Sequence, residues 1–164
     1  MSEGRAFTAS VLTVSDGVKA GTRRDESGDA LRVLLEKNGY RVAAMMVVPD
    51  EADEIERALR DLQTSSDLIV TTGGTGFGPR DVTPEATKRV IEREAPGLVI
   101  LMITAGMRAT DLAALSRGIA GSAGSTLIVN LPGSPRGATE NLQALLAVMP
   151  HALEVLTGDT EHRT

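Results

Sequence analysis

Two aspartates lie in stretches whose residue types suit chemistry on phosphate groups. Asp50 stands in Val48-Pro-Asp-Glu51, directly after an apolar run, and Asp81 stands beside Arg80 in a loop rich in Gly and Pro. Mg²⁺ is usually bound by one or two carboxylates together with phosphate oxygens of a substrate. Two carboxylates at adjacent strand ends can share one such ion, so Asp50 and Asp81 are the candidate metal ligands.

Each aspartate also has a purely structural interpretation. Asp50 precedes a helical pattern and would serve as its N-cap, an interpretation about as strong as a functional one. Thr83 suits the N-cap of the next helix, with Pro84 at the first helical position, so Asp81 is not needed as a cap there. Asp81 could instead form an Asx turn. The functional interpretation is therefore stronger for Asp81 than for Asp50.

The glycine-rich stretch Thr71-Thr-Gly-Gly-Thr-Gly76 follows the apolar run 68–70. Glycine supplies the positive φ of tight turns, and it also lets backbone N–H groups approach a phosphate beside a helix N-terminus. The stretch is not a Walker A loop, because no Gly-Lys-Ser/Thr follows it, and it lacks the GxGxxG spacing. On this pattern alone a simple turn is favoured over an anion site by about two to one.

Two further predicted strand ends carry polar residues. Ser15-Asp16-Gly17 follows the first apolar run, and Pro132-Gly133-Ser134-Pro135 follows the last one. Either stretch could simply be a turn. Arg117 could place its guanidinium on an anion, although a single arginine is usually a surface residue. Because ligands of open α/β sheets bind beyond the carboxyl ends of the strands, these stretches are expected around one crevice.

The strands that would position these residues are marked by near-continuous apolar runs. Such runs are typical of a parallel sheet that is covered on both faces. They predict buried strands at 9–14, 42–48, 68–71 and 126–131.

Helical patterns separate these strands, which predicts an α/β fold. Apolar residues at helical spacing predict helices around 30–35, ending near Gly39, and across 52–62. A last helical pattern covers 138–156, where Pro150 breaks the helix unless a new one begins there. The run Leu98–Ile103 fits a helix or a strand equally well.

Composition limits the classes of function. The 164 residues suggest a single domain over 1–164, and the net charge of −5 argues against nucleic acid, as do only three aromatic residues. The absence of cysteine removes thiolate chemistry and Cys-ligated zinc, and two histidines, His151 and His162, make a His-based metal site improbable. No apolar run is long enough to span a membrane, and no export signal is recognisable, so a cytoplasmic protein is expected.

The chain resembles the molybdenum-cofactor proteins of the MogA/MoaB type, which include the gephyrin N-terminal domain and its plant counterpart. The resemblance rests on Thr71–Gly76 followed by Arg80-Asp-Val-Thr-Pro-Glu85, and on matches between about 9 and 156. The other matching stretches are Leu12–Asp16, Asp25–Gly28, Val48–Glu51, Glu94–Gly97, Leu115–Arg117 and Asn130–Pro135.

This resemblance implies a three-layer α/β/α fold with a doubly wound, mostly parallel sheet, and a homotrimer. It implies transfer of AMP from ATP to molybdopterin with release of pyrophosphate, using Mg²⁺, before a separate molybdate-insertion protein acts. Asp50 and Asp81 match the catalytic, metal-binding acidic pair. The residues matched to nucleotide and pterin contacts are Ser15, Asp16, Thr72, Gly73, Gly74, Thr75, Gly76, Arg80, Thr83, Pro132, Gly133 and Ser134.

Two other functions stay open at this point. One is a non-catalytic member that binds molybdopterin or serves as a scaffold, although such a protein would not need both Asp50 and Asp81. The other is an enzyme that acts on a different pterin or nucleotide.

The segment 97–124 departs from the family pattern. Ile100 and Ile103 replace the Glu and Arg of many bacterial members, and the Thr-Pro that usually precedes Leu-Ser-Arg is absent. The segment also gathers many apolar residues, which either complete the core or form a subunit interface.

Overall fold

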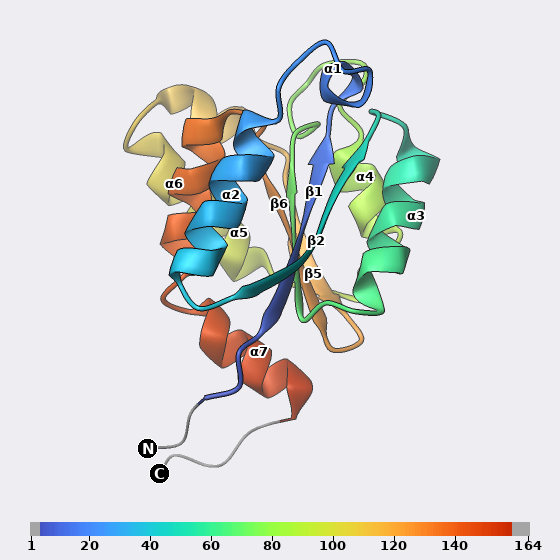
Figure 1. Ribbon diagram of the computed structural model, residues 1–164. Helices are drawn as coiled ribbons and strands as arrows, with labels where there is room; N and C mark the ends of the chain where they lie inside the picture. Colours follow the sequence, from blue (N-terminus) through green and yellow to red (C-terminus); the bar gives the residue numbers. More distant parts are fainter. Residues whose placement is uncertain (1–3, 159–164) are drawn as a thin grey trace.

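The computed structural model describes residues 4–158, which form one six-stranded sheet with the order β2-β1-β3-β6-β5-β4 (Figure 1). Strands β1, β2, β3 and β6 are parallel to one another. At one edge of the sheet, β5 pairs antiparallel with β6 and with the edge strand β4. The strands are β1 (Thr8–Val14), β2 (Arg41–Val48), β3 (Leu68–Thr72), β4 (Arg93–Glu94), β5 (Ala120–Ala123) and β6 (Thr126–Leu131).

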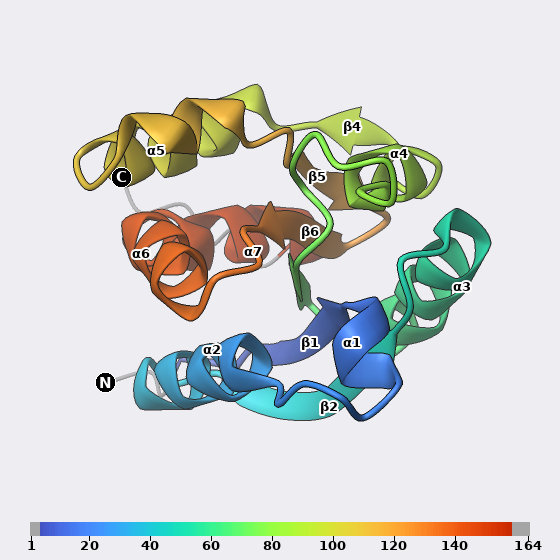
Figure 2. The same ribbon diagram turned by 90° about the horizontal axis from the view of Figure 1, so that it is seen from above.

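Helices cover both faces of the sheet, so the expected three-layer α/β/α fold is confirmed (Figure 2). One layer holds α2 (Glu26–Lys37), α5 (Pro96–Met107) and α6 (Pro135–Leu145), and the other holds α3 (Ala52–Gln63) and α4 (Thr83–Lys88). The remaining helical segments are α1 (Asp16–Lys19), the 3₁₀ helix η1 (Asp111–Leu115) and α7 (Met149–Thr157). Among the helices of the described chain, none is long and apolar enough to cross a membrane.

The core has two halves, one on each face of the sheet. Successive side chains of a strand point to opposite faces. Val11 and Val70 therefore pack in the cluster beneath α2, α5 and α6, whereas Leu12 and Ile69 pack in the cluster beneath α3 and α4. Because β1, β3 and β6 are buried on both faces, most of their residues are apolar, and the others are Thr, Ser and Asn, none of which is charged.

Strand β2 corrects one expectation. Its apolar sequence predicts a strand buried on both faces, but β2 lies at the sheet edge, and Met45 is 40% exposed. The apolar run identified the strand but carried no information about its place in the sheet. Strands β4 and β5 were not expected at all, since Ala-Gly-Ser-Ala of β5 has no apolar run.

The ambiguous segments of the sequence are both helical. Leu98–Ile103 lies inside α5, which begins at Pro96, and Pro150 lies in the first turn of α7 rather than breaking one long helix. The missing N–H of proline is harmless in a first turn, because that group has no partner within the helix.

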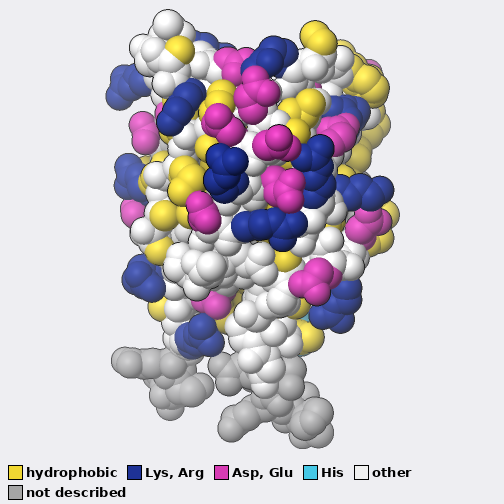
Figure 3. Space-filling view, turned by 90° about the vertical axis from the view of Figure 1, so that its right-hand side faces the viewer, with side chains coloured by type: hydrophobic (Ala, Val, Ile, Leu, Met, Phe, Trp, Pro, Cys, Tyr) yellow, Lys and Arg dark blue, Asp and Glu magenta, His cyan; other side chains and the backbone are white. Residues whose placement is uncertain are grey.

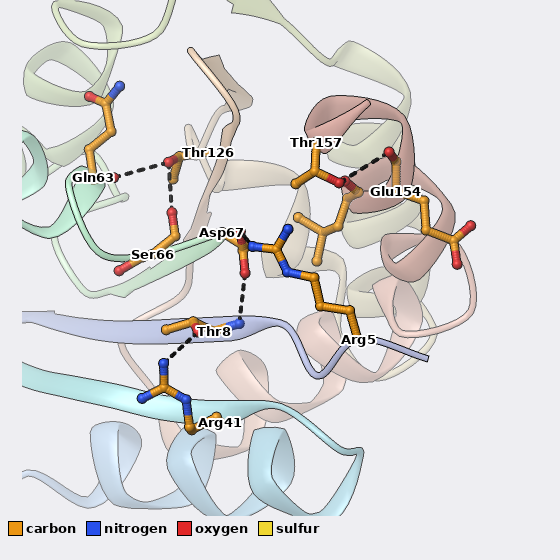
Figure 4. A network of polar contacts seen from close by, with 10 residues as sticks. Arg5, Thr8, Arg41, Gln63, Ser66, Asp67, Thr126, Glu154 and Thr157 are labelled. Carbon is orange, nitrogen blue, oxygen red and sulfur yellow. Dashed lines mark hydrogen bonds and ion pairs between the residues drawn. The ribbon is translucent and has the colours of Figure 1, made fainter. Parts of the chain in front are cut away.

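The end of the sheet opposite α1 is held by a polar network (Figure 4). The Asp67 carboxylate accepts a hydrogen bond from Thr8 N at 2.9 Å and pairs with Arg5, while Thr126 Oγ1 donates to Ser66 O at 2.7 Å. These bonds join the segment before β3 to the starts of β1 and β6. The starts of β1, β3 and β6 are thereby held together, at the end of the sheet opposite the loops that follow these strands.

The outer face of α3 and α4 carries charges of both signs without a large patch of either (Figure 3). Arg89 pairs with Asp53 and Glu56, and Glu56 also pairs with Arg60. The charges on this face are therefore largely neutralised by one another.

Candidate active site

A cleft of about 440 Å³ opens beyond the carboxyl ends of β1, β3 and β6. Its walls come from the strand ends, from the loop before α2 and from the turn between β6 and α6. The lining residues are Thr13, Val14, Ser15, Val18, Arg23, Arg24, Asp25, Glu26, Ser27, Asp50, Thr72, Gly73, Gly74, Asp81, Gly133, Ser134 and Pro135.

The glycine-rich loop forms the floor of this cleft and requires glycine at two positions. Gly73 has φ +100° and Gly74 has φ +68°, a region that other residue types rarely adopt. A Cβ on Gly73 would overlap the carbonyl oxygen of Val14, and one on Gly74 would overlap the Thr83 hydroxyl. Both the backbone conformation and the available space therefore exclude a side chain.

The same loop presents backbone donors. Among the hydrogen bonds of residues 4–158, none is donated by the backbone N–H of Gly74, Thr75 or Gly76. Successive N–H groups in a turn that contains positive φ values form a concave binding site for an anion. The loop is thus suited to holding a phosphate group.

Thr83 supports this loop from beneath and is not the N-cap that the sequence predicts. Val82 occupies the cap position of α4, and Thr83 is the first helical residue. Its buried hydroxyl donates to Gly73 O at 2.9 Å, and its N–H donates to Gly74 O at 3.1 Å. Thr83 therefore fixes the loop conformation instead of starting the helix through its side chain.

Asp50 is not a helix cap either. Glu51 occupies the cap position of α3 without a side-chain hydrogen bond. The Asp50 carboxylate instead accepts from Asp16 N at 2.8 Å, and the Asp16 carboxylate accepts from Asp50 N at 3.0 Å. This reciprocal pair joins the ends of β1 and β2 and holds the Asp50 carboxylate on the cleft wall.

Asp81 combines a structural contact with a place in the cleft. Its Oδ2 accepts from Gly78 N at 2.9 Å, and its own N–H donates to Gly78 O at 3.0 Å, which closes a tight turn. The carboxylate nevertheless lines the cleft, near enough to Asp50 for its charge to act on the pKa of that group. The turn fixes the carboxylate and does not remove it from the site.

The pKa values of Asp16 and Asp50, which follow β1 and β2, are shifted in opposite directions. Burial is the main cause that raises the pKa of Asp50, and the charges of Asp16 and Asp81 raise it further, against the hydrogen bond from Asp16 N. The Arg80 guanidinium lowers the pKa of Asp16. Asp16 is therefore held as a carboxylate by Arg80, while Asp50 is a carboxylate whose charge is disfavoured until a cation approaches.

The acidic pair fits a metal ion only if a substrate supplies further ligands. No group of three or more His, Cys, Asp or Glu side chains within residues 4–158 is arranged to hold an ion. Asp50 and Asp81 supply two carboxylates beside a phosphate-binding loop, which is the ligand set that Mg²⁺ uses when it binds with a nucleotide.

The pKa of Asp50 gives a first testable expectation. Folding raises this pKa, so the folded protein binds the proton more tightly than the unfolded chain, and ionisation of Asp50 destabilises the fold as pH rises. We expect a titration of the side-chain carboxyl followed by NMR to give a midpoint above 3.8, the ordinary value for aspartate. Asp81→Asn should lower that midpoint, because it removes a negative charge while keeping an acceptor for Gly78. A midpoint at or below 3.8 in the unsubstituted protein would contradict this account.

Arg80 does not face a free position in the cleft. Its guanidinium binds Asp16 through two hydrogen bonds of 2.8 and 3.0 Å and Glu51 through one of 2.9 Å. To contact a bound anion it would have to exchange these partners. The positive charges that do line the cleft are Arg23 and Arg24, which sequence reasoning missed although they directly precede the family stretch Asp25–Gly28.

The predicted site residues are brought together around the glycine-rich loop, but not all in one cavity. Eight of them line the cleft, namely Ser15, Asp50, Thr72, Gly73, Gly74, Asp81, Gly133 and Ser134. Thr75, Gly76 and Pro132 line a second cavity of about 270 Å³, which Ser134 also reaches. Asp16 and Arg80 form the ion pair described above, and Thr83 is buried behind the loop.

The second cavity lies on the other side of the loop and is mostly apolar. Val99, Met102 and Ile103 of α5 contribute to it, together with Leu112 and Leu115 of η1. The glycine-rich loop thus separates a polar cleft from an apolar one, with Ser134 at their boundary.

Asp25 and Ser27 also line the cleft. The sequence identifies them only as members of the family stretch Asp25–Gly28 and gives them no role. Asp25 caps α2 by accepting from Gly28 N at 2.9 Å, and it accepts from Thr13 Oγ1 at 2.8 Å. Ser27 Oγ donates to Gly133 O at 2.6 Å. These bonds attach the start of α2 to the ends of β1 and β6, so the wall of the cleft is rigid at this point.

Comparison with known proteins identifies the family of the chain. The family model described as "Probable molybdopterin binding domain" matches residues 10–151. The chain is 37% identical over 155 residues to the molybdopterin adenylyltransferase of Helicobacter pylori strain J99, covering 91% of this chain and 87% of that protein. It is 43% identical over 157 residues to the molybdenum cofactor synthesis protein cinnamon of Drosophila melanogaster, covering 94% of this chain.

Several of these relatives are much longer. The chain spans 26% of cinnamon, 22% of the gephyrin of Dictyostelium discoideum and 48% of a bifunctional molybdenum cofactor biosynthesis protein of Chlorobaculum tepidum. Among solved structures, the molybdopterin biosynthesis enzyme MoaB of Thermus thermophilus superposes with a TM-score of 0.87 at 51% identity, covering 93% of this chain and 97% of that one.

Proposed function

Because this chain belongs to the molybdopterin-binding family of MogA and MoaB, we propose that it is a molybdopterin adenylyltransferase of molybdenum cofactor biosynthesis. It would transfer AMP from ATP to molybdopterin and release pyrophosphate. The observation that carries the proposal is the placement of Asp50 and Asp81 on the walls of one cleft above a loop built to bind phosphate.

Each part of the site has a role in this reaction. The N–H group of Gly74 binds a phosphate oxygen in the polar cleft, and Arg23 and Arg24 offset the negative charge of the triphosphate. Mg²⁺, when bound by Asp50 and Asp81, stabilises the charge that develops on the phosphates. The fixed loop and the fixed carboxylates hold the α-phosphorus in one place, which favours attack by the second substrate.

The two cavities offer separate space for two substrates. The polar cleft suits the charged phosphates, and the mostly apolar cavity behind the loop suits a flat ring system. Ser134 lies at the boundary between them, where its hydroxyl accepts from Gly137 N at 3.0 Å and caps α6. Reaction at that boundary would join the two ligands.

The test is to incubate the protein with ATP, Mg²⁺ and molybdopterin, and to measure pyrophosphate and adenylylated molybdopterin. Both products should form in equal amounts and only when all three components are present. Binding of molybdopterin without pyrophosphate release would favour the non-catalytic, scaffold alternative. Pyrophosphate release with a different pterin or nucleotide, but not with molybdopterin, would favour the other alternative. The product is expected to pass to a separate molybdate-insertion protein.

We also propose that the protein is a homotrimer, with the apolar surface of the segment 97–124 in its interface. Ile100 is 65% exposed and Leu112 is 71% exposed, so these side chains do not complete the core of the single chain. Met107 and Leu115 are about half exposed on the same segment. A surface with this many exposed apolar side chains usually marks an interface.

Light scattering at micromolar concentration should give a mass of three chains. Ile100→Asp should lower that mass, because a carboxylate would be buried in the interface without a partner; Ile100 lines neither of the two cavities. Val33→Asp is the control, since Val33 is also exposed but lies on α2. A mass of 17.2 kDa for the unsubstituted protein with activity retained would overturn the proposal.

A further inference from the structure

We infer that Arg117 is a positioning residue that holds the glycine-rich loop and the Asp81 loop in their active arrangement; the inference rests on the proposed function. Arg117 lies between η1 and β5 and does not line the polar cleft. Its importance comes from the backbone groups that it contacts, which belong to both loops of the site.

Four contacts connect Arg117 to these loops. Its N–H donates to Thr75 O at 2.8 Å, its Nε donates to Gly76 O at 2.7 Å, and its Nη2 donates to Asp81 O at 2.8 Å. Its Nη1 pairs with the carboxylate of Glu85, in the first turn of α4. One residue therefore ties the phosphate-binding loop, the backbone of a proposed metal ligand and the following helix together.

The environment of the guanidinium strengthens these contacts. It lies 5.7 Å from the centre of the Phe77 ring, and the Arg117 side chain is 27% exposed. The ring shields one face of the cation from water, which makes the hydrogen bonds to the two carbonyl oxygens stronger than they would be in solution. Phe77 itself is 74% exposed, so the pairing with Arg117 accounts for its position.

The consequence for catalysis follows from the geometry of Asp81. Its carbonyl oxygen is held by Arg117, and its carboxylate is held by Gly78 N. Without the guanidinium, the turn from Gly78 to Asp81 keeps its own two hydrogen bonds but loses its attachment to Arg117, so the turn and the carboxylate can shift together. A displacement of about 1 Å in a catalytic group can reduce the rate about a hundredfold.

Lysine cannot replace arginine at this position. The planar guanidinium carries five donors in a fixed fork, and three of its nitrogens are used here in three directions. A lysine side chain has a single ammonium nitrogen. It cannot reproduce the contacts that three separate nitrogens of Arg117 make with Gly76 O, Asp81 O and Glu85. Arg117→Lys therefore keeps the charge and removes the geometry, which makes it the informative variant.

The experiment compares Arg117→Lys and Arg117→Ala with the unsubstituted protein in adenylyl transfer, over a range of Mg²⁺ and molybdopterin concentrations. We expect Arg117→Lys to lower kcat by about tenfold or more and to raise the Mg²⁺ concentration for half-maximal rate by a similar factor. The KM for molybdopterin should change by less than about threefold, since Arg117 does not contact the proposed substrates. Arg32→Lys, in an exposed ion pair with Glu36 on α2, is the control and should leave all three values unchanged.

Hydrogen exchange separates this inference from the proposed function. The amides of Gly78, Asp81 and Thr83, which are hydrogen-bonded within these loops, should exchange faster in both Arg117 variants, while those of 8–14 keep their protection. Arg117→Lys with unchanged kcat and unchanged Mg²⁺ dependence, at a temperature where it is folded, would reduce Arg117 to a structural role and overturn the inference. If the unsubstituted protein shows no adenylyl transfer, the proposed function fails, and exchange at Gly78, Asp81 and Thr83 still decides whether Arg117 holds the loops.

Discussion

Asp81→Ala is expected to remove turnover while leaving the protein folded. Asp81 lines the cleft beside Asp50, and its proposed role is to hold Mg²⁺ against the reacting phosphates. The loss of one such electrostatic group lowers kcat by about 10²–10³-fold. The free energy of unfolding should change by no more than about 1 kcal/mol, because the side chain makes one hydrogen bond, to Gly78 N.

Steady-state kinetics and melting curves measure the two effects separately. Asp61→Ala is the matched control, because Asp61 is an exposed aspartate of α3, away from the cleft. Asp50→Ala should lower kcat in the same way. It leaves Asp16 N without its partner, but it also removes a charge that burial disfavours, so its effect on stability should be small. Near-normal rates in both cleft variants would exclude the catalytic assignment of the pair.

Gly74→Val is expected to abolish nucleotide binding and also to destabilise the protein. Valine at φ +68° carries a backbone strain of about 1–3 kcal/mol. Its Cβ would also overlap the Thr83 hydroxyl and approach to 3.3 Å from Asp50 Oδ1, in the floor of the cleft. The loop therefore cannot keep its shape, and its backbone N–H groups are displaced.

Gly39→Val isolates the backbone contribution. Gly39 has φ +86°, and a Cβ there has no neighbour within 4 Å, so this variant carries the strain without the clash. It should lose stability but bind ATP normally in a calorimetric titration. Thr75→Ser should bind nearly normally as well, since it keeps the hydroxyl. Normal ATP binding by Gly74→Val would mean that the loop is only a turn.

The sequence predicted the central part of the fold well, for a physical reason. Strands β1, β3 and β6 are buried on both faces, so most of their residues are apolar and none is charged, and each strand can be recognised from its own sequence. Edge position is a property of the whole sheet, which is why the sequence of β2 predicts a buried strand. The short β5 has no apolar run, and its pairing with β6 depends on the turn at Gly124.

The sequence identified the residues of the candidate site better than it identified what each side chain does there. Family motifs identified Asp50, Asp81 and the glycine-rich loop, and the structure gathers them at the ends of the strands. Local rules assign Thr83 and Asp50 to helix caps, whereas both side chains bind groups on other strands or loops. The sequence favours a surface position for Arg117, because its acceptors are mainly backbone carbonyl oxygens, and these leave no trace in the sequence.

The polar network around Asp67 and the start of α7 both lie at the end of the molecule opposite the cleft (Figure 1). The start of β1 also lies toward that end. The cleft and the ends of the described chain are thus at opposite ends of the sheet, which leaves the cleft open to solvent. This arrangement is compatible with a much longer polypeptide, such as cinnamon, of which this chain matches 26%.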